Sequence, residues 1–122
     1  MKGKKAEISG AELEIMKVLW KHGEPVNTQA INQAVAHKQW KRTTVSTLLT
    51  RLVEKGFADS EKKGNSYFYT SLISKKEYRK AQTRNLIESL YQGSVKELAA
   101  SLVEEGALSE EEIRELKALF KE

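Results

Sequence analysis

The 122-residue sequence predicts a mostly α-helical protein with one small β-hairpin. Segments with the apolar spacing of amphipathic helices run over about 10–22, 27–36, 42–55, 75–92, 95–105 and 110–121. Two short runs, 57–61 and 66–70, lie between the third and fourth helices, and the second alternates with period two. Two short helices followed by a hairpin are the element order of a winged helix-turn-helix domain. We expect such a domain at 1–72 and a helical dimerisation region at 73–122.

Serine–glutamate pairs and glycines mark the predicted helix ends. Capping boxes, in which a serine precedes a glutamate by three residues, occur at Ser9 and Glu12, Ser74 and Glu77, Ser94 and Glu97, and Ser109 and Glu112. Glycines stand where helices should stop, at Gly23, Gly56, Gly93 and Gly106. Ser101 and Glu104 also match the box but lie inside a helical pattern, so the motif alone does not decide a boundary.

The third predicted helix has two contrasting faces. Apolar residues recur at helical spacing on one face, at Val45, Leu48, Leu49 and Leu52, and short hydroxyl side chains occupy the opposite face. Threonine and serine form helices less well than the Glu, Lys and Gln that usually face solvent. Hydroxyls suit a DNA groove, because they donate or accept at base edges and a threonine methyl can meet a thymine methyl. A solvated face on a structural helix is the alternative.

The predicted hairpin carries lysines at its tip. Lys62 and Lys63 precede Gly64 and Asn65, a pair expected to supply the positive φ angles of a tight turn. Such lysines are often solubility charge, but directly after a candidate recognition helix they predict a wing on the DNA backbone. We predict major-groove contacts from Arg42, Thr43, Thr44, Ser46, Thr47 and Thr50. We predict phosphate contacts from Lys41, Arg51, Lys62, Lys63 and Asn65.

Composition narrows the class of protein. Residues 1–72 carry 12 Lys and Arg against 7 Asp and Glu, whereas residues 73–122 carry 9 against 10. This modest basic excess fits a DNA-binding module joined to a module of another role. The absence of cysteine excludes disulfides, thiol chemistry and zinc fingers. No apolar run is long enough for a signal peptide or membrane span, so we expect a cytoplasmic protein with no membrane partner.

Residues that could carry catalysis are not grouped in the sequence. His22 and His37 stand alone, without acidic residues at ligand spacing, so we expect no metal site. No Ser/His/Asp arrangement or glycine-rich phosphate loop is present. We therefore expect no enzyme activity and no cofactor. Trp20 and Trp40 are expected to be core residues rather than stacking platforms for nucleic acid.

The three C-terminal helices need a partner to form a core. About fifty residues in short helices bury too little surface to be stable alone, whereas two packed copies would have a core. We predict a homodimer, which a helix-turn-helix protein also needs to span two half-sites. The predicted interface residues are Leu86, Leu90, Leu98, Leu102, Ile113 and Leu116. The alternative is a monomer in which these helices pack on the N-terminal domain.

Four sequence blocks spread over nearly the whole chain form a family pattern. They are Ile8-Ser9-x-Ala11-Glu12-x-Glu14-x-Met16-x-x-x-Trp20, Trp40-x-x-x-Thr44-Val45-x-Thr47-Leu48-Leu49-x-Arg51-Leu52-x-x-Lys55-Gly56, Tyr67-x-Tyr69 and Leu108-Ser109-x-x-Glu112-Ile113-x-x-Leu116. With these blocks the chain closely resembles the penicillinase repressor family, which includes the methicillin-resistance regulators. The resemblance implies a dimeric repressor that binds a palindromic operator in double-stranded DNA.

The resemblance also implies a way in which repression ends. In the antibiotic-resistance branch, proteolysis by a sensor-coupled protease cuts the dimerisation region, at a position that corresponds here to Ser101 and Leu102. Those regulators present Asn-Phe at the cut, whereas this chain presents Ser-Leu. The copper-responsive branch binds metal through a C-terminal cysteine cluster, which this chain lacks. The alternative function is a winged-helix interaction module that binds an acidic protein partner, and no residue supports a hydrolase.

Overall fold

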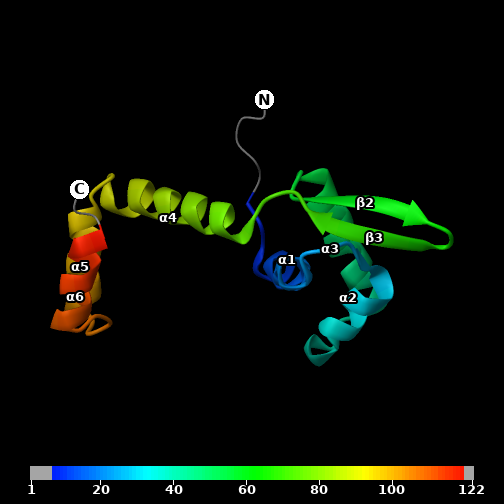
Figure 1. Cartoon of the computed structure of the whole chain (residues 1–122), viewed down its shortest axis with the longest axis horizontal. Coiled ribbons are helices and arrows are strands. Elements are labelled where there is room, and N and C mark those ends of the chain that lie inside the picture. Colours follow the sequence, from blue (N-terminus) through cyan, green and yellow to red (C-terminus); the bar gives the residue numbers. More distant parts are fainter. Residues whose placement is uncertain (1–6, 120–122) are drawn as a thin grey trace. The chain divides into compact units, whose positions relative to one another are not determined.

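The computed structural model describes residues 7–119, which form the helices and strands of Figure 1. In chain order they are α1 (Gly10–His22), β1 (Val26–Asn27), α2 (Thr28–Ala34), the 3-10 helix η1 (Ala36–Lys38), α3 (Arg42–Glu54), β2 (Ala58–Lys63), β3 (Ser66–Ser71), α4 (Lys75–Tyr91), α5 (Val95–Glu104) and α6 (Glu110–Leu119). The chain divides into two compact units, one ending at Glu77 and one starting at Tyr78. The predicted fold class is confirmed. Residues 120–121 of the last predicted helix lie outside the described residues.

A three-stranded antiparallel sheet completes the first unit, with its strands in the order β1-β3-β2. β2 and β3 form the predicted hairpin, in register from Ala58 opposite Ser71 to Lys63 opposite Ser66. β1 adds two residues to the free edge of β3 and was not predicted, because two residues are too few to show an alternating pattern.

The hairpin turn corrects one prediction. Gly64 has a φ of 62°, but Asn65 is not among the residues with positive φ, so the pair does not supply two such angles. One glycine with positive φ at the first central position is the requirement of a type II′ turn. Gly64 alone therefore provides the backbone freedom that the turn needs.

The core of the first unit lies between α1, α2, α3 and the base of the sheet. The predicted apolar stripe of α3 is buried, with Val45, Leu48, Leu49 and Leu52 each at most 6% exposed. It packs with the buried side chains of the other elements, which are Ile15, Met16, Leu19, Val26, Ile31, Val35, Phe57 and Ala58. Burying this stripe leaves the opposite, hydroxyl-bearing face of α3 at the surface.

The second helix is shorter than predicted. α2 ends at Ala34, because Val35 leaves α-helical geometry with φ −105° and ψ 16° while its side chain stays in the core. The 3-10 turn η1 follows, and Gln39 in a left-handed conformation (φ 60°) ends it before α3 begins. The predicted range 27–36 was therefore two residues too long at its C-terminal end.

Helix ends follow the predicted capping residues. After α3, the Gly56 amide donates to the Val53 carbonyl (3.0 Å) and the Phe57 amide donates to the Leu52 carbonyl (2.9 Å), with Gly56 at φ 87°. These two bonds form a Schellman motif, which ends α3 and directs the chain into β2. Both capping-box bonds also form at the serine–glutamate pairs that begin at Ser9, Ser74 and Ser109.

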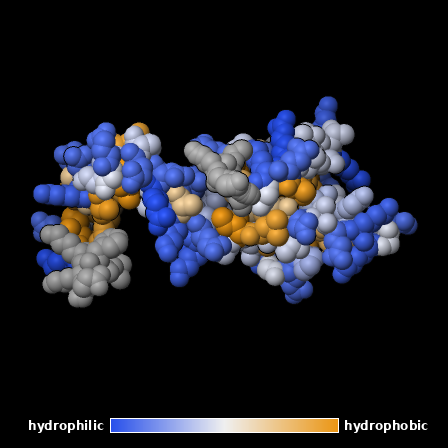
Figure 2. Space-filling model, turned by 90° about the horizontal axis from the view of Figure 1, so that it is seen from above, coloured by the Kyte–Doolittle hydropathy of each residue, from blue (hydrophilic) through white to orange (hydrophobic). Residues whose placement is uncertain are grey.

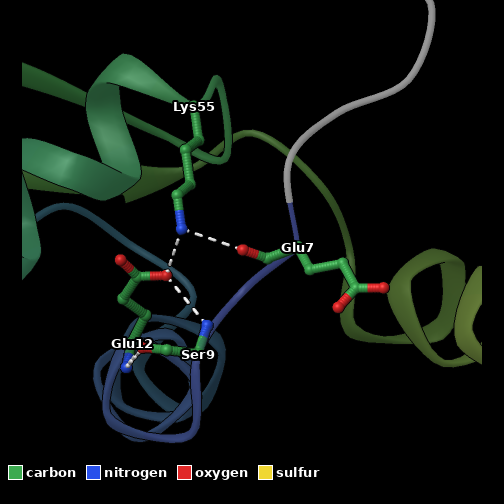
Figure 3. Close-up of polar contacts among 4 residues, drawn as sticks. All are labelled: Glu7, Ser9, Glu12 and Lys55. Atoms are coloured by element: carbon green, nitrogen blue, oxygen red, sulfur yellow. Dashed lines mark hydrogen bonds and ion pairs between the residues drawn. The ribbon is translucent and has the colours of Figure 1, made fainter.

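A buried ion pair joins the start of α1 to the end of α3 (Figure 3). The Lys55 Nζ lies 2.7 Å from Glu12 Oε1 and donates a second bond of 2.8 Å to the Glu7 carbonyl. The same Glu12 oxygen accepts from the Ser9 amide at 2.9 Å. The Glu12 side chain is 2% exposed and that of Lys55 is 24% exposed. Glu12 therefore caps its own helix and fixes it to the residue after α3.

The ionised form of Glu12 is the stable one. Burial acts to raise the pKa of its carboxyl, but the hydrogen bonds from Lys55 and Ser9 and the charges of Lys55 and Arg51 outweigh burial. The pKa of Glu12 therefore lies below the ordinary value of 4.5.

The second unit, which contains most of α4 together with α5 and α6, leaves its apolar residues uncovered. Among the side chains described between 78 and 119, none is buried. Leu86 is 41% exposed, Leu90 64%, Val95 49% and Val103 43%. Apolar residues of these helices are visible at the surface among hydrophilic ones in Figure 2. None of the helices within 7–119 is long and apolar enough to cross a membrane.

We predict that Lys55→Met lowers the free energy of unfolding by about 3 kcal/mol near neutral pH, because a buried carboxylate is left without its cation. Since the pKa of Glu12 is lowered on folding, the ion pair stabilises the protein above the ordinary pKa of 4.5, and this contribution is lost as the pH falls through the folded-state pKa. The difference in the free energy of unfolding between Lys55→Met and wild type should therefore become smaller in acid.

Urea unfolding at about pH 7 and about pH 3.5 measures this effect. Lys17→Met is the matched control, since Lys17 makes an exposed pair with Glu14 at 3.3 Å. Its removal should change stability by less than about 0.5 kcal/mol. If the free energies of unfolding of Lys55→Met and wild type differ by the same amount at neutral pH and in acid, the stabilising role of the Glu12–Lys55 ion pair is contradicted.

Candidate nucleic-acid interface

One face of α3 presents the hydroxyl side chains predicted to read bases. The predicted residues on this helix and just before it are all exposed, namely Lys41, Arg42, Thr43, Thr44, Ser46, Thr47, Thr50 and Arg51. Ser46, Thr47, Thr50 and Arg51 line a shallow hollow of about 290 Å³ together with Glu54. The exposed face thus combines hydroxyls with a flanking guanidinium, a combination that can contact base edges and phosphate together.

The wing places its two lysines against aromatic rings. Lys62 and Tyr67 are directly opposite in the strand register, with the Lys62 Nζ 5.9 Å from the ring centroid of Tyr67. The Lys63 Nζ lies 5.8 Å from the ring centroid of Phe68. Both lysines are exposed, as is Asn65 at the turn. Cation–π contacts at exposed sites are weak, so they orient the ammonium groups without preventing a phosphate contact.

A groove connects α2, the start of α3 and the wing. It has a volume of about 740 Å³, and it brings Arg42 and Asn65, which are far apart in sequence, to one surface. Its walls also include residues that the sequence analysis did not predict: Asn27, Thr28, Gln29, Asn32, Gln33, Ala36, Trp40, Ser66 and Tyr67. The run of amide side chains at 27–33 was the signal that could have identified this wall, because amides are common donors to phosphate oxygens.

A hydrogen bond joins the groove wall to the wing. The Thr28 hydroxyl donates to the Tyr67 carbonyl at 3.4 Å, between the first turn of α2 and β3. On β3, burial and the neighbouring Tyr67 raise the pKa of the Tyr69 phenol above its ordinary value of 10.0.

The two tryptophans have different surroundings. Trp20 is half-buried and its indole Nε1 donates to Ser71 Oγ at 3.0 Å and to the Ile73 carbonyl at 2.9 Å. Trp40 is half-buried and lines the groove beside Arg42. Both were expected to be core residues, but neither is among the buried residues of the core. Within residues 7–119, no group of three or more His, Cys, Asp or Glu could hold a metal ion.

The fold and this surface define a class of protein. A short helix, a second helix with an exposed hydroxyl face and a lysine-bearing hairpin form a winged-helix domain of the DNA-binding type. Residues 8–122 match the family model described as penicillinase repressor, and the chain belongs to that family. It is thus a member of a family of DNA-binding transcriptional repressors, not of enzymes, and the resemblance found in the sequence is confirmed.

Relatives match over nearly their full lengths. The chain is 33% identical over 116 residues to the penicillinase repressor of Bacillus licheniformis, covering 95% of this chain and 91% of the relative. It is also 33% identical over 120 residues to the methicillin resistance regulatory protein MecI of Staphylococcus aureus strain N315, covering 98% of each chain.

Two solved structures match the first part of the chain. The DNA-binding domain of the repressor BlaI is 38% identical, with a TM-score of 0.55, and the match covers 62% of this chain and 92% of that one. The monomeric form of Bacillus licheniformis BlaI in complex with the blaP half-operator matches with a TM-score of 0.52, 38% identity and coverages of 62% and 92%.

Proposed function

We propose that the chain is a cytoplasmic repressor that binds a palindromic DNA operator as a homodimer, with α3 in the major groove and the hairpin on the backbone. The observation that carries this proposal is the exposed hydroxyl face of α3 beside a lysine-bearing wing. It is supported by the similarity to a repressor whose structure was solved with a half-operator, at 38% identity. In this proposal, each copy of the first unit binds one half-site.

The roles of the exposed residues follow from their chemistry. Arg42, Thr43, Thr44, Ser46, Thr47 and Thr50 contact base edges in the major groove. Lys41, Arg51, Lys62, Lys63 and Asn65 contact phosphates, which fix the position of the domain without reading sequence. The amide residues of the groove wall, Gln29 and Asn32 among them, extend the phosphate contacts toward α2.

The proposed dimer is formed by the second unit. Its apolar residues lack a buried core of their own, since none of the side chains described between 78 and 119 is buried. Leu86 and Leu90 are exposed, and Leu98, Leu102, Ile113 and Leu116 are half-buried. A second copy of the same surface would cover these residues and remove apolar area from water.

The proposed end of repression is a cut between Ser101 and Leu102. Both residues lie inside α5 and are half-buried, and the Tyr91 hydroxyl donates to Ser101 Oγ at 3.2 Å. Cutting α5 would remove Leu102 from the dimer core while leaving the first unit intact. A helix must open locally before a protease can cut it, so fraying of α5 would control the rate.

DNA binding itself is tested by gel shift with operator and random duplex at two salt concentrations. We expect the chain to bind both duplexes, the operator more tightly, and affinity to fall steeply with salt, because phosphate contacts release counterions. Binding of an acidic protein would also weaken with salt, so failure to bind any duplex is the outcome that excludes the function.

Base reading is tested at Thr47. Thr47→Ala should weaken operator binding by about 1–3 kcal/mol and relax the preference at particular base pairs, because a base contact is lost. Lys63→Ala is the control and should weaken operator and random duplex equally, since phosphate contacts carry no sequence information. Competition binding against operators with single base changes measures both. Equal losses on operator and random duplex for Thr47→Ala would remove Thr47 from base reading.

Dimerisation is tested at Leu98. Leu98→Asp should convert the dimer to monomer in sedimentation and reduce operator affinity, because an unpaired charge in an apolar interface costs several kcal/mol. Ala100→Asp is the matched control, since Ala100 is exposed on the same helix. A folded Leu98→Asp protein that still sediments as a dimer would contradict this interface.

Proteolytic release is tested in cells that contain the genomic sensor. After the inducer is added, mass spectrometry of the repressor should detect a fragment ending at Ser101, and uninduced cells should contain the intact chain. An intact chain in induced cells would exclude proteolysis as the switch and leave the DNA-binding function standing.

A further inference from the structure

Hydrogen bonds fix each residue of the connection between β3 and α4. Leu72, Ile73 and Ser74 separate β3 from α4. The Leu72 amide donates to the Phe57 carbonyl at 2.8 Å. Ser74 Oγ accepts from the Glu77 amide at 3.0 Å, and the Ser74 amide donates to Glu77 Oε1 at 3.3 Å. This short connection is therefore an ordered joint within the first unit.

Trp20 holds the middle of this joint. Its indole N–H lies between two acceptors, Ser71 Oγ at 3.0 Å and the Ile73 carbonyl at 2.9 Å. The Ser71 hydroxyl also donates to the Ile73 carbonyl and accepts from the Ile73 amide, the latter at 3.2 Å. Trp20 belongs to the last turn of α1, so a helix that lies 53 residues earlier in the chain contacts the residue that precedes the cap of α4.

Apolar packing is only partial at this place. Leu72 is 57% exposed, and Leu19, Trp20, Leu72 and Ile73 line an open hollow of about 410 Å³. Hydrophobic contact is non-directional and is here incomplete, whereas hydrogen bonds fix both distance and angle. The indole N–H is therefore suited to set the position of the backbone at Ile73.

We propose that Trp20 is a positioning residue that holds the start of α4 on the DNA-reading unit and so limits which half-site separations the dimer can bridge. The proposal rests on the proposed function, because α4 leads into the region assigned to dimerisation. In a dimer, two copies of the first unit are joined through the second units. Binding of the second half-site adds most affinity when the distance set by this connection matches the distance between the half-sites. If the connection between β3 and α4 could pivot, the dimer would bind operators with several half-site separations, whereas a fixed connection favours one separation.

The test is Trp20→Phe, which keeps an aromatic ring but removes the N–H donor. We expect affinity for a single half-operator to stay within about twofold of wild type, and affinity for the full palindrome to fall about three- to tenfold, the effect of one net hydrogen bond. With operators whose half-sites are moved by about one or two base pairs, the variant should discriminate less sharply between separations than wild type does.

Ser71→Ala removes one of the two acceptors of the indole N–H together with the bonds between the Ser71 hydroxyl and Ile73, so it should change the preference among separations in the same direction as Trp20→Phe. It carries the test if Trp20→Phe fails to fold. The double variant should lose less affinity than the sum of the two single losses, because the two side chains share the bond between the indole N–H and Ser71 Oγ. Ser60→Ala is the matched control, since Ser60 is a half-buried serine on the neighbouring strand, opposite Tyr69 in the register and on the same face of the sheet as Ser71.

The outcomes separate this proposal from the function on which it rests. A folded Trp20→Phe dimer with the wild-type preference among separations overturns the positioning role. Equal weakening of half-operator and palindrome binding also overturns it, because such a result indicates damage to the DNA-reading unit. If wild type binds the palindrome no better than random duplex, the proposed function has failed, and the positioning role falls with it.

Discussion

The ion pair between Glu12 and Lys55 is the contact on which the placement of α3 depends. The apolar stripe of α3 decides which face of the helix is buried, but apolar contact is non-directional and leaves sliding along the core possible. A buried carboxylate that accepts from both the Lys55 ammonium and the Ser9 amide fixes the end of α3 against the first turn of α1. The hydroxyl face of α3 is thereby presented at a defined place beside the wing.

α1 connects both ends of the first unit, although none of its residues is assigned a DNA contact. Its first turn holds the end of α3 through Glu12, and its last turn holds the entrance to α4 through Trp20. A substitution in α1 can therefore affect DNA reading and the joint to α4 independently. In the proposed function, substitutions in α1 would therefore change operator binding although they lie away from the candidate interface.

Local features of the fold were predictable from sequence, and contacts between distant residues were not. The periodicity that places Val45 and Leu52 in the core and the glycine that ends α3 are signals within one or two helical turns. The bond from Trp20 to Ile73 spans 53 residues and the one from Lys55 to Glu12 spans 43, and no local pattern encodes either. The groove wall was also missed, because β1 and α2 lie beside the wing only through the pairing of β1 with β3, which is distant in sequence.

The division into two units explains how modest DNA contacts suffice for a repressor in the proposed scheme. In residues 1–72, Lys and Arg outnumber Asp and Glu by only 5, 12 against 7. The exposed face of α3 carries mainly short hydroxyls, with Arg42 and Arg51 as its cationic side chains. A single reader of this kind would bind a half-site weakly. Joining two readers raises affinity by about 10²- to 10⁴-fold through effective concentration, provided that the joint lets both engage. Control of repression can therefore act on the second unit and its joint, without altering a single contact to DNA.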